Sequence, residues 1–113
     1  LVLSQVECKS ADKGKAETVK ASTTLEDGTV WLKAVFSTDA TEKKAFADKG
    51  DRVVTCDFLY STDGKKFKKL GQPFRVREGQ WIGAKMGTFC TRPNMVINDG
   101  GWVDVDWFRV TKK

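Results

Sequence analysis

The stretch RVVTCDFLYSTDGKKFKKL, residues 52–70, decides the fold. Its first part, Arg52–Tyr60, is rich in β-branched and aromatic residues, which are typical of a strand. The pair Asp63-Gly64 follows, and an Asp-Gly pair supplies the positive φ angles that a tight hairpin turn needs. Lys65–Leu70 is then the expected returning strand. This hairpin is the strongest local signal in the chain, and it predicts an antiparallel β-protein.

Strand signals recur along most of the chain. Further strands are expected at Leu1–Cys8, Glu17–Ser22, Thr29–Phe36, Phe74–Val76, Ala84–Cys90 and Trp102–Val110. One short helix is expected over Ala40–Lys49, because Asp39 and Glu42 form a loose capping box and Gly50 supplies a stop. Short strands separated by Gly, Asp and Asn turns predict an all-β sandwich or jelly-roll-like arrangement, with residues 1–113 in a single domain.

Composition and charge limit the classes of protein to which the chain can belong. Apolar residues make up 40% of the sequence, and four Trp and seven Phe are too many aromatic residues for a disordered segment. Apolar runs such as Val30–Phe36 are far shorter than the ~20 residues of a membrane span. The net charge of +5 suits an anionic partner, but the basic residues are dispersed, apart from the Lys-Lys-Phe-Lys-Lys run at 65–69. That run is typical of the solvated face of a hairpin, and no base-stacking pattern accompanies it, so nucleic acid is not an expected partner.

The cysteine and histidine content excludes several kinds of active site. Cys8, Cys56 and Cys90 show no Cys-x-x-Cys spacing, and the sequence contains no histidine, so a conventional Cys/His zinc site is excluded. Cysteine-protease and serine-hydrolase triads are excluded as well, because both need an imidazole base. The cysteines are expected to be buried free thiols, with one disulfide as the alternative.

The segment Trp102–Val110 carries two carboxylates among its aromatic and aliphatic residues. Along an extended strand, Asp104 and Asp106 share a face and have Cα atoms about 7 Å apart. This separation superficially suits the acid/base pair of an inverting glycosidase, but such a pair flanks the scissile bond, whereas these two point the same way. We therefore expect them to bond turn backbone or to hold a structural calcium ion, with Asp106 as the first carboxylate ligand. No catalytic residue and no other cofactor are expected.

The four tryptophans are expected in two kinds of environment. Trp31 and Trp107 lie within apolar strands and are expected in the core. Trp81 follows a Gly-containing turn, so it is expected at a loop–strand junction, where an exposed ring can stack on the apolar face of a sugar or contact another domain. Core packing is the alternative for Trp81. Trp102 borders a polar, Gly-rich loop and is a weaker candidate of the same kind.

Two runs of sequence resemble a known family. The runs FLYSTDGKKFKKLGQPFRVREGQWIGAKMGTFC (58–90) and GGWVDVDWFRV (100–110) are similar to the C-terminal concanavalin A-like β-sandwich domain of glycoside hydrolase family 43, the β-xylosidases and α-arabinofuranosidases. The shared pattern is an aromatic–Tyr-Ser-x-Asp-Gly hairpin, a Leu-Gly-x-Pro-Phe step, an aromatic–x-Gly-x-x-x-Gly strand and a closing Asp-x-Asp-Trp-Phe strand. The resemblance covers about half of the chain well, and Leu1–Lys49 only loosely.

The resemblance implies a supporting role. In that family the catalytic carboxylates lie on a separate β-propeller domain of the same protein, so this chain is expected not to be an enzyme by itself. The resemblance also implies xylan or arabinoxylan, or oligosaccharides derived from them, as the carbohydrate, and a secreted or periplasmic location. In some relatives an aromatic residue before the Gly-x-x-x-Gly strand helps to shape the propeller's sugar pocket, and Trp81 occupies that position here.

The length of the chain and its aromatic residues lead to further hypotheses about its extent and its function. The family domain is usually much longer, so we expect the C-terminal part of such a sandwich or a trimmed form of it. The start at Leu1, without an initiator Met or signal peptide, indicates a piece of a longer protein. The main alternative function is an autonomous carbohydrate-binding module for xylan, with Trp81, Trp102 and Tyr60 as its stacking platform. A purely structural sandwich has no positive feature in its favour, and an independent hydrolase is the least expected function.

Overall fold

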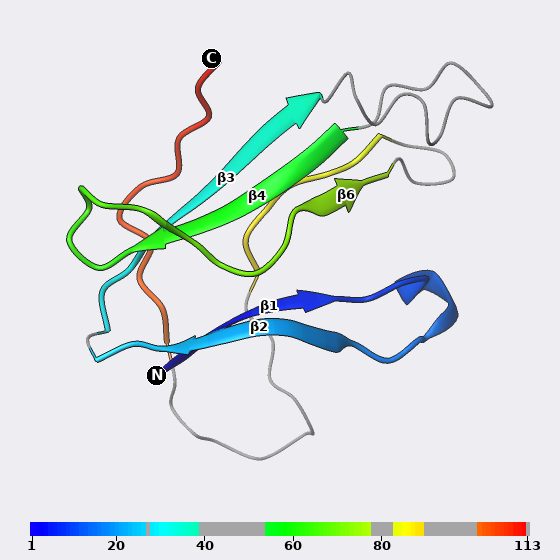
Figure 1. Ribbon diagram of the computed structural model, residues 1–113, viewed down its shortest axis with the longest axis horizontal. Helices are drawn as coiled ribbons and strands as arrows, with labels where there is room; N and C mark the ends of the chain where they lie inside the picture. The colour runs from blue at the N-terminus through cyan, green and yellow to red at the C-terminus, as the bar shows by residue number, and fades with distance from the viewer. Residues whose placement is uncertain (27, 39–53, 78–82, 90–101, 113) are drawn as a thin grey trace.

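The computed structural model describes residues 1–26, 28–38, 54–77, 83–89 and 102–112 (Figure 1). In chain order the elements are β1 (Val2–Glu7), the 3-10 turn η1 (Ala11–Lys13), β2 (Thr18–Thr24), β3 (Trp31–Thr38), β4 (Val54–Ser61), β5 (Lys68–Lys69) and β6 (Phe74–Val76). All strand pairs among the described residues are antiparallel, which confirms the predicted all-β class. The short helix expected over 40–49 lies outside the described residues.

The strands β1 and β2 form a two-stranded sheet. The register between them shifts at Gln5 and Val6, so that Lys20 has no residue opposite it. A bulge of this kind bends the strand locally and re-aims the side chains beside it. The connection between the strands passes through η1, which is flanked by Ser10 and Gly14 with left-handed φ angles of 61° and 64°.

The second sheet is built around β4 (Figure 1). The strand β3 pairs with β4 along its whole length, from Trp31 opposite Ser61 to Thr38 opposite Val54. The short strands β5 and β6 pair with β4 near its two ends. Within the described part of the chain, β4 is thus the only strand with neighbours along both edges, which agrees with its β-branched and aromatic composition.

The turn after β4 is held by the side chain of Asp63. Its Oδ1 accepts hydrogen bonds from the backbone N–H groups of Lys65 and Lys66 and from the hydroxyl of Ser61, each at 2.8 Å. The predicted pairing of strands around this turn is therefore confirmed, but residues 62–67 connect β4 and β5, which is longer than the predicted tight turn, and only Gly64 of the Asp-Gly pair has a positive φ. The returning strand, β5, is shorter than the predicted range 65–70, because Asp63 takes the first two N–H groups that would otherwise extend the ladder.

The two tryptophans predicted for the core differ in their environment. Trp31 is half-buried and packs over the turn, since a Cβ added at Gly64 would lie 3.0 Å from its ring. Gly64 has a φ of 68°, so this position needs glycine both for its backbone angle and for the close ring. Trp107 is 61% exposed, and its predicted place in the core is wrong.

Two further strand predictions differ from the structure. The sequence predicts strands at Ala84–Cys90 and Trp102–Val110, but the described residues of these ranges, 84–89 and 102–110, are not assigned to a strand. No backbone hydrogen bond joins either segment to a strand within the described parts of the chain. A segment with alternating side chains becomes a strand only where a neighbouring strand forms backbone hydrogen bonds with it. The alternation itself does not identify that neighbouring strand.

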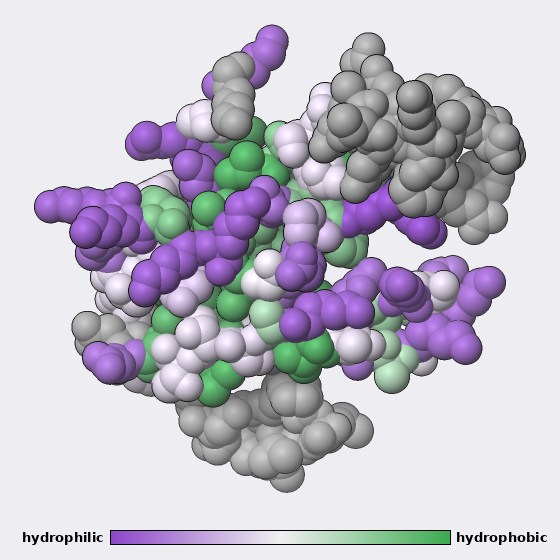
Figure 2. Space-filling view, in the orientation of Figure 1, coloured by the Kyte–Doolittle hydropathy of each residue, from purple (hydrophilic) through white to green (hydrophobic). Residues whose placement is uncertain are grey.

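Few of the described side chains are fully buried. Leu25, Cys56 and Leu70 are the buried apolar residues, and the polar residues Gln5 and Ser61 are also buried, at 8% and 2% exposure. The rings of Phe58 and Phe74 add a tilted aromatic pair between β4 and β6, with centroids 6.4 Å apart. Figure 2 shows apolar patches that remain visible between the hydrophilic side chains on one face of the molecule.

The side-chain amide of Gln5 connects the two sheets. Its Nε2 donates a hydrogen bond to the backbone oxygen of Gln72 at 2.8 Å, and its Oε1 accepts one from the N–H of Gln72 at 3.1 Å. We call this pair of bonds the Gln5 clamp. Gly71, just before Gln72, has a φ of 72°, and a Cβ there would overlap Oε1 of Gln5. The clamp therefore requires glycine at position 71.

Replacing Gly71 by alanine should strongly destabilise the chain. A non-glycine residue with left-handed backbone angles costs about 1–2 kcal/mol. Displacing the Gln5 amide adds about 1–3 kcal/mol, because it leaves partly buried polar groups without partners. We expect Gly71→Ala to lower the free energy of unfolding by about 2–5 kcal/mol, measured by urea titration with tryptophan fluorescence.

The variant Gly14→Ala is the matched control for this measurement. Gly14 has a similar φ of 64°, but nothing lies within 4 Å of the position that a Cβ would occupy. Its replacement should cost only the backbone penalty of about 1–2 kcal/mol. Equal losses in the two variants would show that the contact between Gly71 and Gln5 adds nothing to stability.

Asp63 should make the stability of the chain depend on pH in acid. Hydrogen bonds from the N–H groups of Lys66 and Lys65 and from Ser61 lower the pKa of the Asp63 carboxyl below its usual value of 3.8. A carboxyl whose pKa is lower in the folded state stabilises the fold above its unfolded-state pKa, and this contribution is lost as the pH falls through the folded-state pKa.

Asp63→Asn keeps an acceptor oxygen at the turn but removes the titrating group. It should therefore lose less stability than the parent chain when urea unfolding is compared at about pH 7 and about pH 3. The same loss in both proteins would exclude Asp63 as a source of the acid dependence.

Candidate functional site

Tyr60, one of the predicted sugar-binding residues, lies between the two sheets. It is half-buried on β4, and its hydroxyl is 3.5 Å from the hydroxyl of Thr23 on β2, where either group can donate. Its cross-strand neighbours are Leu32 on β3 and Lys68 on β5. Tyr60 therefore has a structural partner in the first sheet, and only part of its side chain is open to a ligand.

The other two predicted aromatic residues are Trp81 and Trp102. Trp81 lies outside the described residues. Trp102 is 81% exposed, which makes it the most exposed tryptophan in the described part of the chain. An exposed indole presents a flat apolar face of the kind that stacks on sugars.

The C-terminal segment, residues 102–112, exposes more aromatic surface than the sequence indicates. Trp107 and Phe108 are 61% and 60% exposed, and the guanidinium of Arg109 lies 5.6 Å from the ring centroid of Trp107. This cation–π contact occupies part of the Trp107 ring. Sequence analysis missed the exposure of Trp107, because the same alternation of valine and tryptophan is expected of a core strand.

The C-terminal segment also carries the two carboxylates for which the sequence predicts a structural calcium ion or bonds to turn backbone. Asp104 and Asp106 both belong to the exposed segment, two positions apart. Within the described residues, no group of three or more acidic, histidine or cysteine side chains is close enough to hold a metal ion. Calcium takes six to eight oxygen ligands, so these carboxylates would need backbone carbonyls or further residues to complete a site. A structural calcium at Asp106 stays a prediction.

The two described cysteines are free thiols in different environments. Cys56 is 2% exposed, and burial, followed by the nearby charge of Asp57, raises the pKa of its thiol, while a backbone hydrogen bond at Val35 opposes this. Cys8 is half-buried, and its Sγ donates to the backbone oxygen of Lys15 at 3.0 Å. The raised pKa keeps Cys56 protonated at neutral pH, so it is not an activated nucleophile. Cys90 lies outside the described residues.

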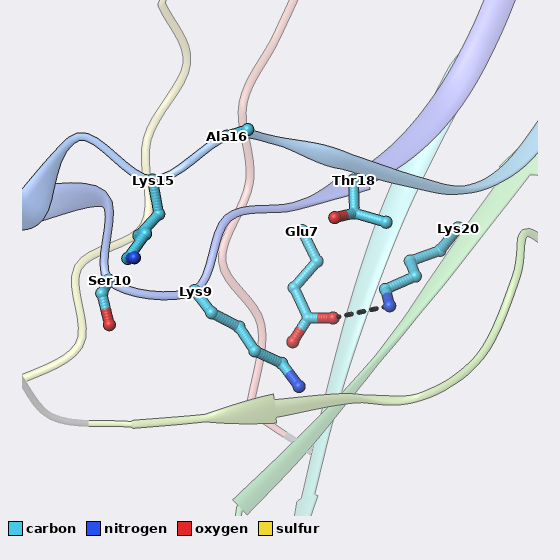
Figure 3. Close-up of a pocket in the computed structure, with 7 residues that line it drawn as sticks. All are labelled: Glu7, Lys9, Ser10, Lys15, Ala16, Thr18 and Lys20. Atoms are coloured by element: carbon cyan, nitrogen blue, oxygen red, sulfur yellow. Dashed lines mark ion pairs between the residues drawn. The ribbon is translucent and has the colours of Figure 1, made fainter.

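A basic cavity lies where the connection between β1 and β2 folds back on the strands (Figure 3). Its volume is about 400 Å³, and its polar lining comes from Glu7, Lys9, Ser10, Lys15, Thr18 and Lys20. In the sequence these lysines are dispersed. The fold gathers three of them because the hairpin returns beside itself, and the lysine content of residues 9–20 is the only signal that points to it.

The chain matches, over residues 2–111, the family described as the β-xylosidase C-terminal concanavalin A-like domain. The chain belongs to this family. The match extends beyond the half of the chain that carries the recognised motifs, and it confirms the predicted concanavalin A-like class. Because residues 2–24 are matched as well, the β1–β2 sheet belongs to the family's domain.

A β-xylosidase of Formosa agariphila is 43% identical to the chain over 51 residues. That segment is 45% of this chain and 8% of the relative. The chain thus spans a small part of a much longer protein to which it is similar. No solved structure matches the chain. Among the described residues, no helix has the length and apolar character needed to cross a bilayer.

The different burial of the two thiols should give different reactivity in this β-xylosidase-type domain. Cys56 should be alkylated by iodoacetamide at least about tenfold more slowly than Cys8 in the folded chain, because alkylation requires an accessible thiolate. Peptide mass spectrometry of timed samples measures both rates, and the same experiment in urea is the control in which the rates should converge. Equal rates in the folded chain would contradict the burial of Cys56.

Proposed function

We propose that this chain is a non-catalytic accessory β-sandwich domain of a family 43 glycoside hydrolase that acts on xylan or arabinoxylan. The match to the β-xylosidase C-terminal domain family over residues 2–111 is the observation that carries the proposal. The proposed partner is a catalytic β-propeller domain of the same protein. Because the substrate is a plant polysaccharide too large to enter a cell, the proposed location is secreted or periplasmic.

Several features of the chain support a role without chemistry of its own. The sequence has no histidine to act as a general base. Asp104 and Asp106 follow one another along a single exposed segment, which does not allow them to flank a glycosidic bond from two sides. The buried Cys56 has a raised pKa and is not a nucleophile at neutral pH.

The proposed contribution to the enzyme is made by an aromatic ring at the domain junction. Trp81 matches the position at which an aromatic residue of some relatives helps to shape the sugar pocket of the propeller. A ring placed there would stack on the substrate and exclude water from one side of the pocket. Such a residue positions the sugar and needs no reactive group.

The variant Trp81→Ala, made in the whole protein with its catalytic domain, should lose activity. We expect kcat/KM for an aryl β-xyloside to fall by about tenfold or more, because small losses of substrate positioning are costly in rate. Phe89→Ala is the control, since it removes an aromatic ring that is 87% exposed and is not among the predicted sugar-binding residues. Unchanged kinetics in Trp81→Ala, or an equal fall in both variants, would count against the proposal.

The exposed rings of Trp102 and Trp107 favour a second candidate, an autonomous carbohydrate-binding module for xylan. The two candidates give opposite results for the chain on its own. An autonomous module is retarded in native gels that contain soluble xylan, and Trp102→Ala releases it. An accessory domain that acts only at the propeller migrates at the same rate with and without neutral xylan.

A further inference from the structure

The basic cavity is open to solvent, and all of its lining residues except Glu7 are exposed. Its volume of about 400 Å³ falls within the range of about 300–1,000 Å³ that is common for ligand pockets. Such pockets are mostly apolar and aromatic, whereas this one contains three lysines, one glutamate and two hydroxyl residues. The lining therefore indicates a polar ligand.

The charge of the cavity is not neutralised by its own residues. Lys20 forms an ion pair with Glu7, with Nζ and Oε2 3.2 Å apart, and Figure 3 shows the two side chains turned toward each other. Within the described residues, no carboxylate lies within ion-pairing distance of Lys9 or Lys15. Two ammonium groups are thus left to attract an anion, and the attraction is strongest at low ionic strength.

The backbone that carries Lys9 and Lys15 is held in place. The thiol of Cys8, which precedes Lys9, donates to the backbone oxygen of Lys15 and so ties the two lysine-bearing segments together. Two backbone hydrogen bonds of 2.9 and 3.0 Å close the turn at η1. Ser10, a cavity residue, has a φ of 61° and is the only described residue other than glycine with a positive φ. Backbone strain of this kind persists only where the surrounding structure enforces it.

The bulge in the first sheet supplies the third lysine. Because Lys20 has no residue opposite it in β1, its side chain is free to turn toward Glu7 at the end of that strand. The ion pair fixes the Glu7 carboxylate, which remains an acceptor for ligand hydroxyl groups. The hydroxyls of Ser10 and Thr18 can both donate and accept.

This set of groups fits an anion that also carries hydroxyl groups. The lining contains no arginine, so Lys9 and Lys15 would meet the anion as point charges, without the bidentate geometry of a guanidinium. It contains no aromatic ring on which a nucleic acid base could stack. A uronic acid offers one carboxylate for the lysines and several hydroxyls for Glu7, Ser10 and Thr18. We propose that the basic cavity binds the uronic acid substituent of an acidic xylan.

This proposal rests on the proposed function, since it names the kind of polysaccharide that the domain would handle. It is tested by titrating the 113-residue chain, in calorimetry, with a xylo-oligosaccharide that carries one glucuronic acid. The neutral xylo-oligosaccharide of the same length is the first comparison, and a short oligothymidylate is the second. Each titration is made at about 20 mM and about 300 mM NaCl, which spans strong and weak screening.

The test variant is Lys9→Gln/Lys15→Gln, which leaves the ion pair of Lys20 and Glu7 intact. The matched control is Lys65→Gln/Lys66→Gln, which removes the same charge from two exposed lysines whose backbone N–H groups, not side chains, hold the hairpin turn. We expect the acidic oligosaccharide to bind about tenfold more tightly than the neutral one at low salt, and its Kd to rise about three- to tenfold in the test variant but not in the control. High salt should weaken binding of the acidic oligosaccharide and leave any binding of the neutral one unchanged.

Three results would overturn the proposal. These are equal affinity for the acidic and neutral oligosaccharides, equal weakening in the test and control variants, and tighter binding of oligothymidylate than of the acidic oligosaccharide. None of them bears on the turnover of the whole protein with Trp81→Ala. A failure of this inference is therefore distinguishable from a failure of the proposed function.

Discussion

The two hydrogen bonds of the Gln5 clamp are the constraint on which the described structure depends. Only Leu25, Cys56 and Leu70 are its buried apolar residues, and apolar contact by itself has no direction. The Gln5 amide adds direction, because its N–H donates to the backbone oxygen of Gln72 and its oxygen accepts a hydrogen bond from the backbone N–H of the same residue. A polar pair in a partly buried place is costly to break, so it also discriminates against other arrangements of the sheets.

The same short piece of β1 links the clamp to the basic cavity. The register shift follows Gln5 directly and leaves Lys20 unopposed in β2, and Lys20 then pairs with Glu7 two residues beyond the shift. A regular hairpin would place a residue of β1 opposite Lys20 and move every following side chain to the other face. The register shift in β1 therefore determines both how the two sheets pack at Gln5 and which charged side chains lie together at the end of the β1–β2 hairpin.

Sequence reasoning succeeded where a local rule determines the structure. The hairpin around Gly64, the strand Phe74–Val76 and the strands β1 and β2 follow from turn chemistry and from β-branched composition, although the connection between β4 and β5 is longer than a tight Asp-Gly turn. Sequence reasoning failed where the structure of a segment depends on residues that lie far from it in the sequence. The exposure of Trp107 and the absence of a strand over 102–110 could not be read from alternation, because burial and pairing require a partner that the alternation does not name. The basic cavity was missed for the same reason, since its lysines are separated in sequence and meet only through the hairpin.

Weak binding at the basic cavity is sufficient for the role that we propose for this chain. A polysaccharide held by one site has its neighbouring sugars confined near the rest of the protein, and binding at a second site then depends on an effective concentration set by the connecting chain. For short flexible connections this concentration reaches the millimolar range, so a contact worth only about 1 kcal/mol can still raise occupancy at a catalytic pocket severalfold. An open cavity with two unpaired lysines suits this use better than a deep site, because each product must leave before the next section of polymer can enter.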